Sequence, residues 1–224
     1  MVVVRQTVEK RPFSPFLWLF VLPGVVVVAI VSFVLFQPIT VLPRIALAPG
    51  FGLQNEAGTL VSNEDLRGTI TLYSFSTVHC GIECGQTAAD IAAVQQTLAN
   101  QITTPINLVT LALNGESPAD LTGLGGDSGL VSWEWLTGDI QRMRYVVGGG
   151  FNLYYDQQGD SVDFEPRYVL VDSLGMIRAY YFMAQPDPIL LLRDVNFLVD
   201  EIKNSTGSKK LAYEAAHLFL CYPD

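Results

Sequence analysis

The sequence predicts an α/β domain joined to one N-terminal transmembrane helix. Half of the 224 residues are hydrophobic and only 16% are charged, which excludes a disordered chain. The apolar excess lies in one run, Phe16–Phe36, that contains no charged residue. The remaining sequence alternates between β-branched or aromatic runs and stretches with apolar residues at helical spacing, which is typical of an α/β fold.

The charge distribution excludes a nucleic-acid-binding protein. The formal net charge is −9, from 13 basic and 22 acidic side chains. Three of the basic residues (Arg5, Lys10 and Arg11) and one acidic residue (Glu9) lie within residues 1–11, which leaves 10 basic against 21 acidic side chains, or −11, in the remainder. Contacts with phosphate need clustered Lys and Arg, which this remainder lacks, so we expect no nucleic-acid partner.

The apolar run Phe16–Phe36 is long enough to cross a bilayer once. As a helix, its 21 residues rise about 30 Å, which is the thickness of the hydrocarbon core. Basic residues precede the run and the next positive charge is Arg44, so the positive-inside rule predicts that residues 1–15 are cytoplasmic. Residues 37–224 then lie in the periplasm or an equivalent space. We therefore predict a single-pass protein of the cell inner membrane, with membrane lipid as a partner.

A cleaved signal peptide is the competing interpretation of this N-terminal region. The sequence Ala46-Leu47-Ala48 has the form of a cleavage site. Signal peptides, however, have apolar regions of about 7–15 residues, shorter than the run found here, and Pro49 directly follows the cut. The membrane anchor is the preferred interpretation.

The segment after the span predicts a tether followed by the folded domain. Residues 37–50 hold three prolines and few charges, which favours a semi-stiff linker. The domain is predicted to begin near Phe51 and to extend through residues 51–204. Its first feature is a hairpin turn at Asn55–Gly58. The glycine-rich stretch Gly115–Gly129 predicts a mobile loop.

The other elements follow from periodicity and composition. Continuous apolar and β-branched runs predict strands, helical spacing of apolar residues predicts helices, and a turn at 173–175 joins the last two strands into a hairpin. Strands are predicted at 69–76, 106–113, 168–172 and 176–182, and helices at 86–100, 139–147 and 187–203. A polar break, Ser205–Lys210, precedes a short apolar helix at Leu211–Leu220 within a tail of residues 205–224. This tail helix is expected to pack on the domain, on the membrane surface or on a partner.

Two of the three cysteines carry the main chemical signal. Cys80 and Cys84 lie between a predicted central strand and the start of a helix. The positive end of a helix dipole stabilises a thiolate, which is both a redox nucleophile and a soft metal ligand. Glu83 lies between them and opposes this effect, because a nearby negative charge raises the pKa of a thiol. Inert buried thiols or a static disulfide are the alternatives.

The residues around these cysteines resemble a known family. Phe75–Cys84 is similar to the F-x-x-T-H-C-x-x-x-C-P motif of the SCO/SenC proteins, which are membrane-anchored, thioredoxin-like assembly factors for the copper centre of cytochrome c oxidase. Further similarities at residues 52–58, 62–68, 136–138 and 169–178 extend the resemblance over residues 50–203. The resemblance implies a thioredoxin-like fold with Cys80 and Cys84 as redox-active residues and copper ligands.

Several departures from the family pattern bear on copper. In the family, the two cysteines and one histidine bind the metal, and the position of that histidine is occupied by Phe164. The proline after the second cysteine is Gly85, and the aspartate after the second core strand is Asn114. The third ligand would then have to come from His79 or from His217, which we expect to be a surface or contact histidine. We expect copper binding to be weak or confined to copper(I).

Two further residues have open roles. Pro166 precedes the predicted strand at 168–172, where thioredoxin-like proteins keep a cis-proline facing their cysteines. The alternative is an ordinary proline at the start of a strand. Cys221, the unmatched cysteine, is expected to be a small buried hydrophobe rather than one half of an intermolecular disulfide.

Two functions from different classes remain. In the first, the chain is a SCO/SenC-type thiol-redox or copper-handling protein that serves a respiratory or photosynthetic electron-transport complex, with Cys80 attacking a partner disulfide and Cys84 resolving it. In the second, it is a degenerate domain kept as a permanent accessory subunit without copper. A heme-copper oxidase or quinol-oxidising complex is the expected partner, and the acidic surface suits a c-type cytochrome. A peroxiredoxin-like peroxidase is disfavoured, because the proline–threonine frame before its cysteine is absent.

Overall fold

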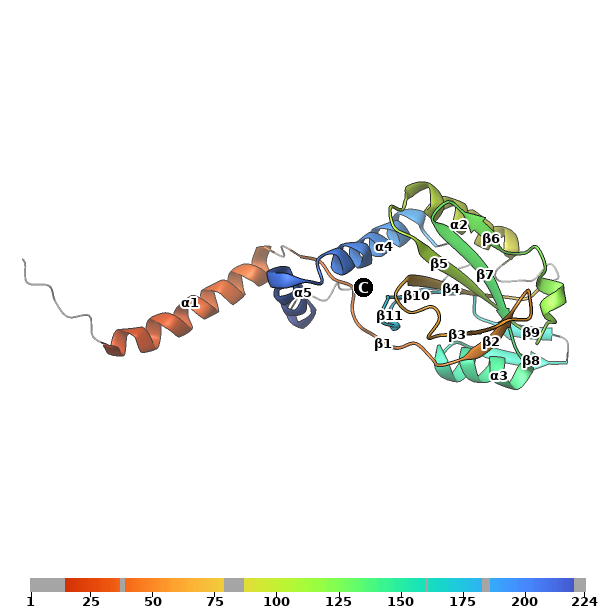
Figure 1. The fold of residues 1–224 in the computed structure, drawn as a ribbon. Coiled ribbons are helices and arrows are strands. Elements are labelled where there is room, and N and C mark those ends of the chain that lie inside the picture. The colour runs from red at the N-terminus through yellow and green to blue at the C-terminus, as the bar shows by residue number, and fades with distance from the viewer. Residues whose placement is uncertain (1–14, 37–38, 79–86, 160, 183–185, 220–224) are drawn as a thin grey trace, which may run out of the picture.

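The computed structural model describes residues 15–36, 39–78, 87–159, 161–182 and 186–219. Figure 1 shows a long N-terminal helix, α1 (Pro15–Phe36), leading to a domain built around one large sheet. Within the described part of the chain, no helix combines the length and the apolarity needed to cross a membrane.

The sheet has the order β1-β11-β10-β4-β5-β7-β2-β3, with β6 paired to β7. Three strands in its middle, β4, β5 and β7, run parallel, and the other pairs in this sheet are antiparallel. The bounds are β1 Ala46–Leu47, β2 Gly52–Asn55, β3 Leu60–Ser62, β4 Ile70–Ser76, β5 Ile106–Ala112, β6 Gly126–Ser128, β7 Val131–Thr137, β10 Tyr168–Val171 and β11 Met176–Tyr181. A separate hairpin pairs β8 (Tyr155–Gln158) with β9 (Ser161–Phe164).

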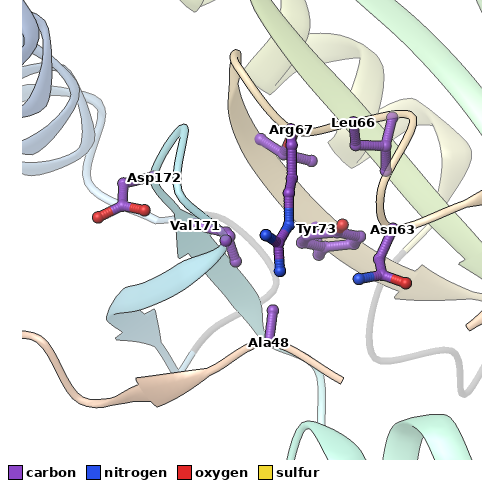
Figure 2. A pocket seen from close by; sticks show the side chains of 9 residues that line it. Ala48, Asn63, Leu66, Arg67, Tyr73, Val171 and Asp172 are labelled. Carbon is purple, nitrogen blue, oxygen red and sulfur yellow. The ribbon is translucent and has the colours of Figure 1, made fainter. Parts of the chain in front are cut away.

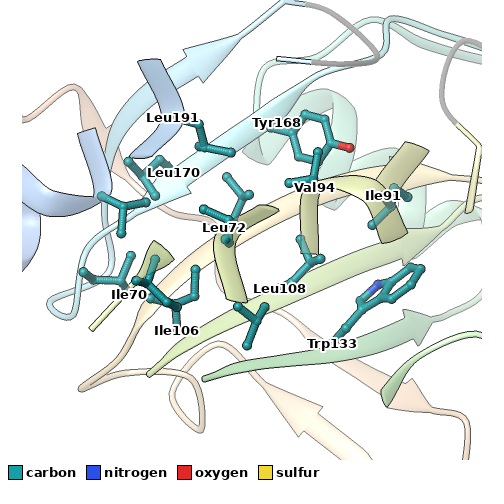
Figure 3. Close-up of a cluster of buried hydrophobic side chains, with 14 of the residues drawn as sticks. Ile70, Leu72, Ile91, Val94, Ile106, Leu108, Trp133, Tyr168, Leu170 and Leu191 are labelled. Atoms are coloured by element: carbon teal, nitrogen blue, oxygen red, sulfur yellow. The ribbon is translucent and has the colours of Figure 1, made fainter. Parts of the chain in front are cut away.

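Helices cover one face of the sheet, and a second hydrophobic cluster covers the other. On the first face, α2 (Ala88–Gln101) and α4 (Pro188–Lys203) pack over alternate residues of the central strands. Figure 3 shows Ile91 and Val94 of α2 above Leu72 and Leu108. Because strand side chains alternate between faces, their neighbours Tyr73 and Val109 belong to the cluster on the other face.

The second face is covered by α3 (Ile140–Arg144), the π-helical turn that continues it (Tyr145–Gly150), and the β8–β9 hairpin. Phe151 lies at the centre of this layer, with its ring centroid 5.0 Å from that of Tyr73 and 5.4 Å from that of Phe75. The central strand β4 is therefore buried on both sides, which explains why its sequence, ITLYSFS, contains no charged residue.

Most predicted elements of the domain are confirmed, with small shifts at their ends. These are the turn at Asn55–Gly58, the strands at 69–76, 106–113, 168–172 and 176–182, and the helices at 86–100, 139–147 and 187–203. The mixed α/β sheet covered by helices is confirmed as well. Thr87 and Asp90 form a capping box that fixes the start of α2, and Asp187 caps α4.

Three predictions need correction. Residues 37–50 are not a tether in their described part, because β1 pairs with β11, and Val41 and Leu42 are buried. The stretch Gly115–Gly129 contains a 3₁₀ turn (Pro118–Leu121) and strand β6, which its pairing with β7 holds in place. The polar break at Ser205–Lys210 is shorter than predicted, since α5 spans Gly207–Phe219.

Candidate functional site

The candidate site lies at the edge of the sheet where the parallel strands β4, β5 and β7 end. Loops that follow parallel strands meet at this edge, which is a common position for functional sites in α/β folds. Thr77 and Val78 follow β4, Asn114 and Glu116 follow β5, and Thr137 is the last residue of β7. Segments from three strands therefore converge where the cysteine motif begins.

Glu116 holds this edge together through both its side chain and its backbone. The Thr77 hydroxyl donates to Glu116 Oε1 at 2.7 Å, and the Val78 backbone N–H donates to the same oxygen at 3.2 Å. The Thr137 hydroxyl donates to the Glu116 carbonyl oxygen at 2.7 Å. Glu116 is 8% exposed, so its carboxylate is removed from water and oriented by these neutral donors.

Asn114 adds a further contact and explains one departure from the family motif. Its side-chain amide donates to the Thr77 hydroxyl oxygen at 3.2 Å. An ionised aspartate at this position would have no proton to donate. Asn114 also has a φ of +70°, a left-handed conformation that asparagine adopts more readily than most residues. An asparagine therefore suits both the hydrogen bond and the backbone here.

The predicted site residues His79, Cys80 and Cys84, and with them Glu83 and Gly85, lie outside the described residues, as does Cys221. The elements that flank the motif are described and have the predicted arrangement. Val78, which precedes Cys80 by two residues, is hydrogen-bonded to Glu116. Helix α2 begins at Ala88, four residues after Cys84. The motif thus connects the end of the central strand to the start of a helix.

Phe164 lies in the β8–β9 hairpin directly opposite Tyr155. Both rings are partly buried against the cluster that contains Phe75, the first residue of the motif. The pKa of Tyr155 is raised, mainly by burial. The Arg144 charge opposes this rise, and the Glu116 carboxylate adds to it. The hairpin that carries position 164 is therefore within electrostatic reach of Glu116, and the aromatic ring at 164 offers no donor atom for a metal.

His217 is far from this edge. It lies in α5, and its Nε2 is 2.9 Å from Glu201 Oε1. Glu201 in turn binds Arg178, which pairs with Asp172 beside the Thr71 end of β4. The six residue steps of β4 separate this end from Ser76 by about 20 Å. His217 cannot complete a metal site at the motif, so of the chain's two histidines only His79 remains a candidate.

The described residues contain no group of three or more His, Cys, Asp or Glu side chains suited to a metal. Thiolates fit copper(I), which is a soft ion, whereas the imidazole that would favour copper(II) is missing at position 164.

Of the two interpretations left open for Pro166, the structure supports the ordinary proline and not the cis-proline. None of the described peptide bonds is cis, so the bond from Glu165 to Pro166 is trans. Residues 165–167 connect β9 to β10, and the Arg167 guanidinium lies 4.0 Å from the centroid of the Phe182 ring. Pro166 is an ordinary proline before a strand.

A small cavity at the opposite edge of the sheet is not a second candidate site. Figure 2 shows the Arg67 side chain above Ala48 and Val171, beside the ring of Tyr73. The cavity measures about 10 Å³, which is room for one water molecule. Burial raises the pKa of Tyr73, so its hydroxyl stays protonated.

Sequence reasoning missed Glu116, Thr77 and Thr137 as parts of the site. A usable signal was present, because Asn114-Gly115-Glu116 directly follows a predicted buried strand, as the cysteine motif does. Polar residues after neighbouring parallel strands lie at the same edge of a sheet.

Comparisons with known proteins identify the family and the fold of the chain. The SCO1/SenC family model matches residues 42–200. None of the curated proteins matches the chain by sequence.

Solved structures share the fold at low identity. A SCO1/SenC family lipoprotein from Bacillus anthracis str. Ames superposes with a TM-score of 0.62 and 19% identity, covering 70% of this chain and 97% of its own. BsSco, a member of the Sco family of cytochrome c oxidase assembly proteins in which a disulfide switch was identified, gives 0.59 and 22%, with 69% and 94% covered. Copper-bound ScoI from Arabidopsis thaliana gives 0.58 and 20%, with 70% and 99% covered.

Proposed function

We propose that the chain, which belongs to the SCO1/SenC family, is a membrane-anchored protein. It handles copper(I) or exchanges disulfides through Cys80 and Cys84. The observation that carries the proposal is the placement of the motif between the end of β4 and the start of α2, at an edge organised by Glu116. The client is a membrane electron-transport complex of the heme-copper oxidase type or a quinol-oxidising complex, and a c-type cytochrome is a further candidate partner.

The redox step uses the two thiols in sequence. The Cys80 thiolate attacks one sulfur of a partner disulfide and releases the other sulfur as a thiolate. The Cys84 thiolate then attacks the Cys80 sulfur of the mixed disulfide and frees the second partner thiol. The partner gains two electrons, and Cys80 and Cys84 lose two as they form a disulfide. The disulfide switch of BsSco and the copper bound to Arabidopsis ScoI support both chemistries for this family.

Cysteine variants test this proposal. The reduced full chain should bind one copper(I) ion, and Cys80→Ser and Cys84→Ser should each abolish tight binding and disulfide formation. Cys221→Ser is the matched control and should behave as the parent. Competition with a copper(I) chelator and thiol alkylation followed by mass measurement give the two readouts. Unchanged copper binding in both motif variants would contradict the proposal.

We also propose that α1 anchors the protein in the inner membrane with the domain on the periplasmic side. The uncharged sequence of Phe16–Phe36 and the basic residues that precede it support this orientation. The test uses Leu60→Cys, at an exposed position of β3, in a chain without its native cysteines. A membrane-impermeant thiol reagent should label it in intact cells. If the reagent labels this cysteine only after lysis, the domain faces the cytoplasm and the proposed orientation is wrong.

A permanent accessory subunit is the second candidate function. Phe164, at the position of the family's copper-binding histidine, favours it, because a lost ligand suggests a lost metal role. Purification in mild detergent separates the two candidates. A stoichiometric large complex with no redox-active cysteine pair would select the subunit, and a free protein with reactive thiols would select the assembly factor.

A further inference from the structure

Helix α5 is fixed to the residues that directly follow α1. Val41 and Ala216 form a small buried cluster, and Ile39 and Tyr213 pack against it. The Arg44 guanidinium also pairs with Glu214 at 3.3 Å. Ile39 follows the last residue of α1 by three positions, and three residues span at most about 11 Å. In Figure 1, α5 accordingly lies beside the end of α1.

The outer side of α5 carries leucines where a helix exposed to water would carry polar residues. Leu211 is 75% exposed and Leu218 is 78% exposed. They are seven residues apart, which brings them within about 20° of each other around the helix axis. Ala216, which is fully buried, lies on the opposite side of the helix. The domain therefore covers one side of α5 and leaves a stripe of two leucines on the other, with Glu214 between them.

The charges around this stripe are positive in a protein that is otherwise acidic. Lys210 directly precedes Leu211 and is exposed. Lys209 is seven residues before Ala216, on the other side of the helix, where its Nζ donates to Asn204 Oδ1 at 3.0 Å. The acidic residue of the helix, Glu214, is paired with Arg44. Exposed leucines beside lysines are typical of helices that lie in the headgroup region of a bilayer.

We infer that the outer side of α5, defined by Leu211, Leu218 and Lys210, rests on the surface of a membrane that contains anionic lipids. This inference rests on the proposed anchor, because α1 sets the distance between α5 and the bilayer. Contact at both α1 and α5 would restrict the rotation of the domain and hold the motif edge at a fixed height above the membrane.

Depth-dependent fluorescence quenching tests the inference on the full chain. An environment-sensitive dye is attached to Leu211→Cys, Leu218→Cys or Val26→Cys, each in a chain with Cys80, Cys84 and Cys221 replaced by Ser. Leu60→Cys, which is 65% exposed in β3, is the matched control. The proteins are reconstituted into phosphatidylcholine–phosphatidylglycerol vesicles whose lipids carry a spin label near the headgroup or deep in the acyl chain.

We expect dyes at 211 and 218 to be quenched more by the shallow label than by the deep one, since interfacial helices insert only about 5–10 Å. The dye at 26, in the middle of α1, should show the opposite ratio, and the dye at 60 should respond to neither label. A quenched dye at 26 with unresponsive dyes at 211 and 218 would overturn this inference and leave the anchor intact.

Two other outcomes would also overturn the inference. If neither lipid label quenches the dye at 26, α1 does not cross the bilayer, and the inference about α5, which rests on that anchor, is wrong as well. Dyes at 211 and 218 that escape lipid quenching but are shielded from aqueous iodide would show that a protein covers the stripe instead.

Discussion

The two edges of the central sheet bury carboxylates in different ways. At the motif edge, the Glu116 carboxylate accepts hydrogen bonds from the Thr77 hydroxyl and the Val78 backbone amide, which precede Cys80 in the motif. At the opposite edge, Asp172 and Glu201 both bind Arg178, which is 1% exposed. A guanidinium compensates these two charges directly, whereas neutral dipoles orient the carboxylate at the motif edge.

The opposite edge is built to hold distant segments together. Arg178 donates to the backbone oxygens of Leu42 and Pro43 at 2.7 and 3.0 Å, as well as to its two carboxylates. Its guanidinium therefore joins the chain that follows α1 to the β10–β11 hairpin and α4. We therefore expect the contacts of Arg178 to make this edge the more important of the two for stability.

Arg178→Met should give the largest effect. It leaves the buried Asp172 and the partly buried Glu201 without their common cation, and removal of one partner from such a cluster costs about 3–5 kcal/mol. Urea unfolding should show this loss in the free energy of unfolding. Arg67→Met is the control, because Arg67 forms an exposed pair with Glu64 that is worth at most about 1 kcal/mol. Equal losses in both variants would contradict the comparison.

The same cluster should make the protein sensitive to acid. Burial raises the pKa of Glu201, but hydrogen bonds from His217 and Arg178 and the charge of Arg178 outweigh it and lower the pKa from 4.5 to about 2. A lowered pKa in the folded state stabilises the protein above pH 4.5, and this contribution is lost as the pH falls toward 2.

Unfolding measured from pH 6 down to about 2 should therefore show a steep loss of stability that is reduced in Glu201→Gln. Glu214→Gln should change the slope less, because Arg44 lowers the pKa of this carboxyl as well but the pair is exposed. An unchanged slope in the Glu201 variant would show that this carboxylate does not control the acid response.

At the motif edge, Glu116→Ala should cost less, about 1–3 kcal/mol, because it strands the Thr77 hydroxyl and the Val78 amide without their acceptor. Glu116→Gln keeps an acceptor oxygen and should recover most of the loss. Thermal and urea unfolding of the two variants measure the difference. Equal destabilisation by Ala and Gln would mean that the negative charge of Glu116, and not its hydrogen bonds, stabilises this edge.

The smallest expected effect concerns copper. Phe164→His should place an imidazole in the hairpin opposite Tyr155 and raise copper(II) affinity at least about tenfold, or 1.4 kcal/mol. Chelator competition and a sulfur-to-copper charge-transfer band are the readouts. Equal affinity in the parent would point to His79 as the ligand that completes the site and would remove Phe164 as the reason for weak binding.

Local sequence patterns by themselves determined the middle of the fold. The run at Thr69–Ser76 predicts β4 because a strand buried on both faces has no polar face to interrupt it. Helical spacing predicts α2 and α4, since each needs one apolar side toward the sheet. The resemblance around Cys80 and Cys84 likewise predicted the family that the comparison with residues 42–200 supports.

Only the tertiary structure decided the elements whose stability comes from distant partners. Val131, Trp133 and Trp135 alternate with polar residues as in a strand, but only pairing places β7 between β5 and β2, where its Glu134 accepts a hydrogen bond from Asn55 at 2.8 Å. Strand β1 has two residues and exists because β11 pairs with it. The periodicity of a segment can be read from its own sequence, because it depends on which side of that segment is buried. The burial of Arg178 cannot be read in this way, because its partners, the carboxylates of Asp172 and Glu201 and the Leu42 carbonyl, come from segments far apart in the chain.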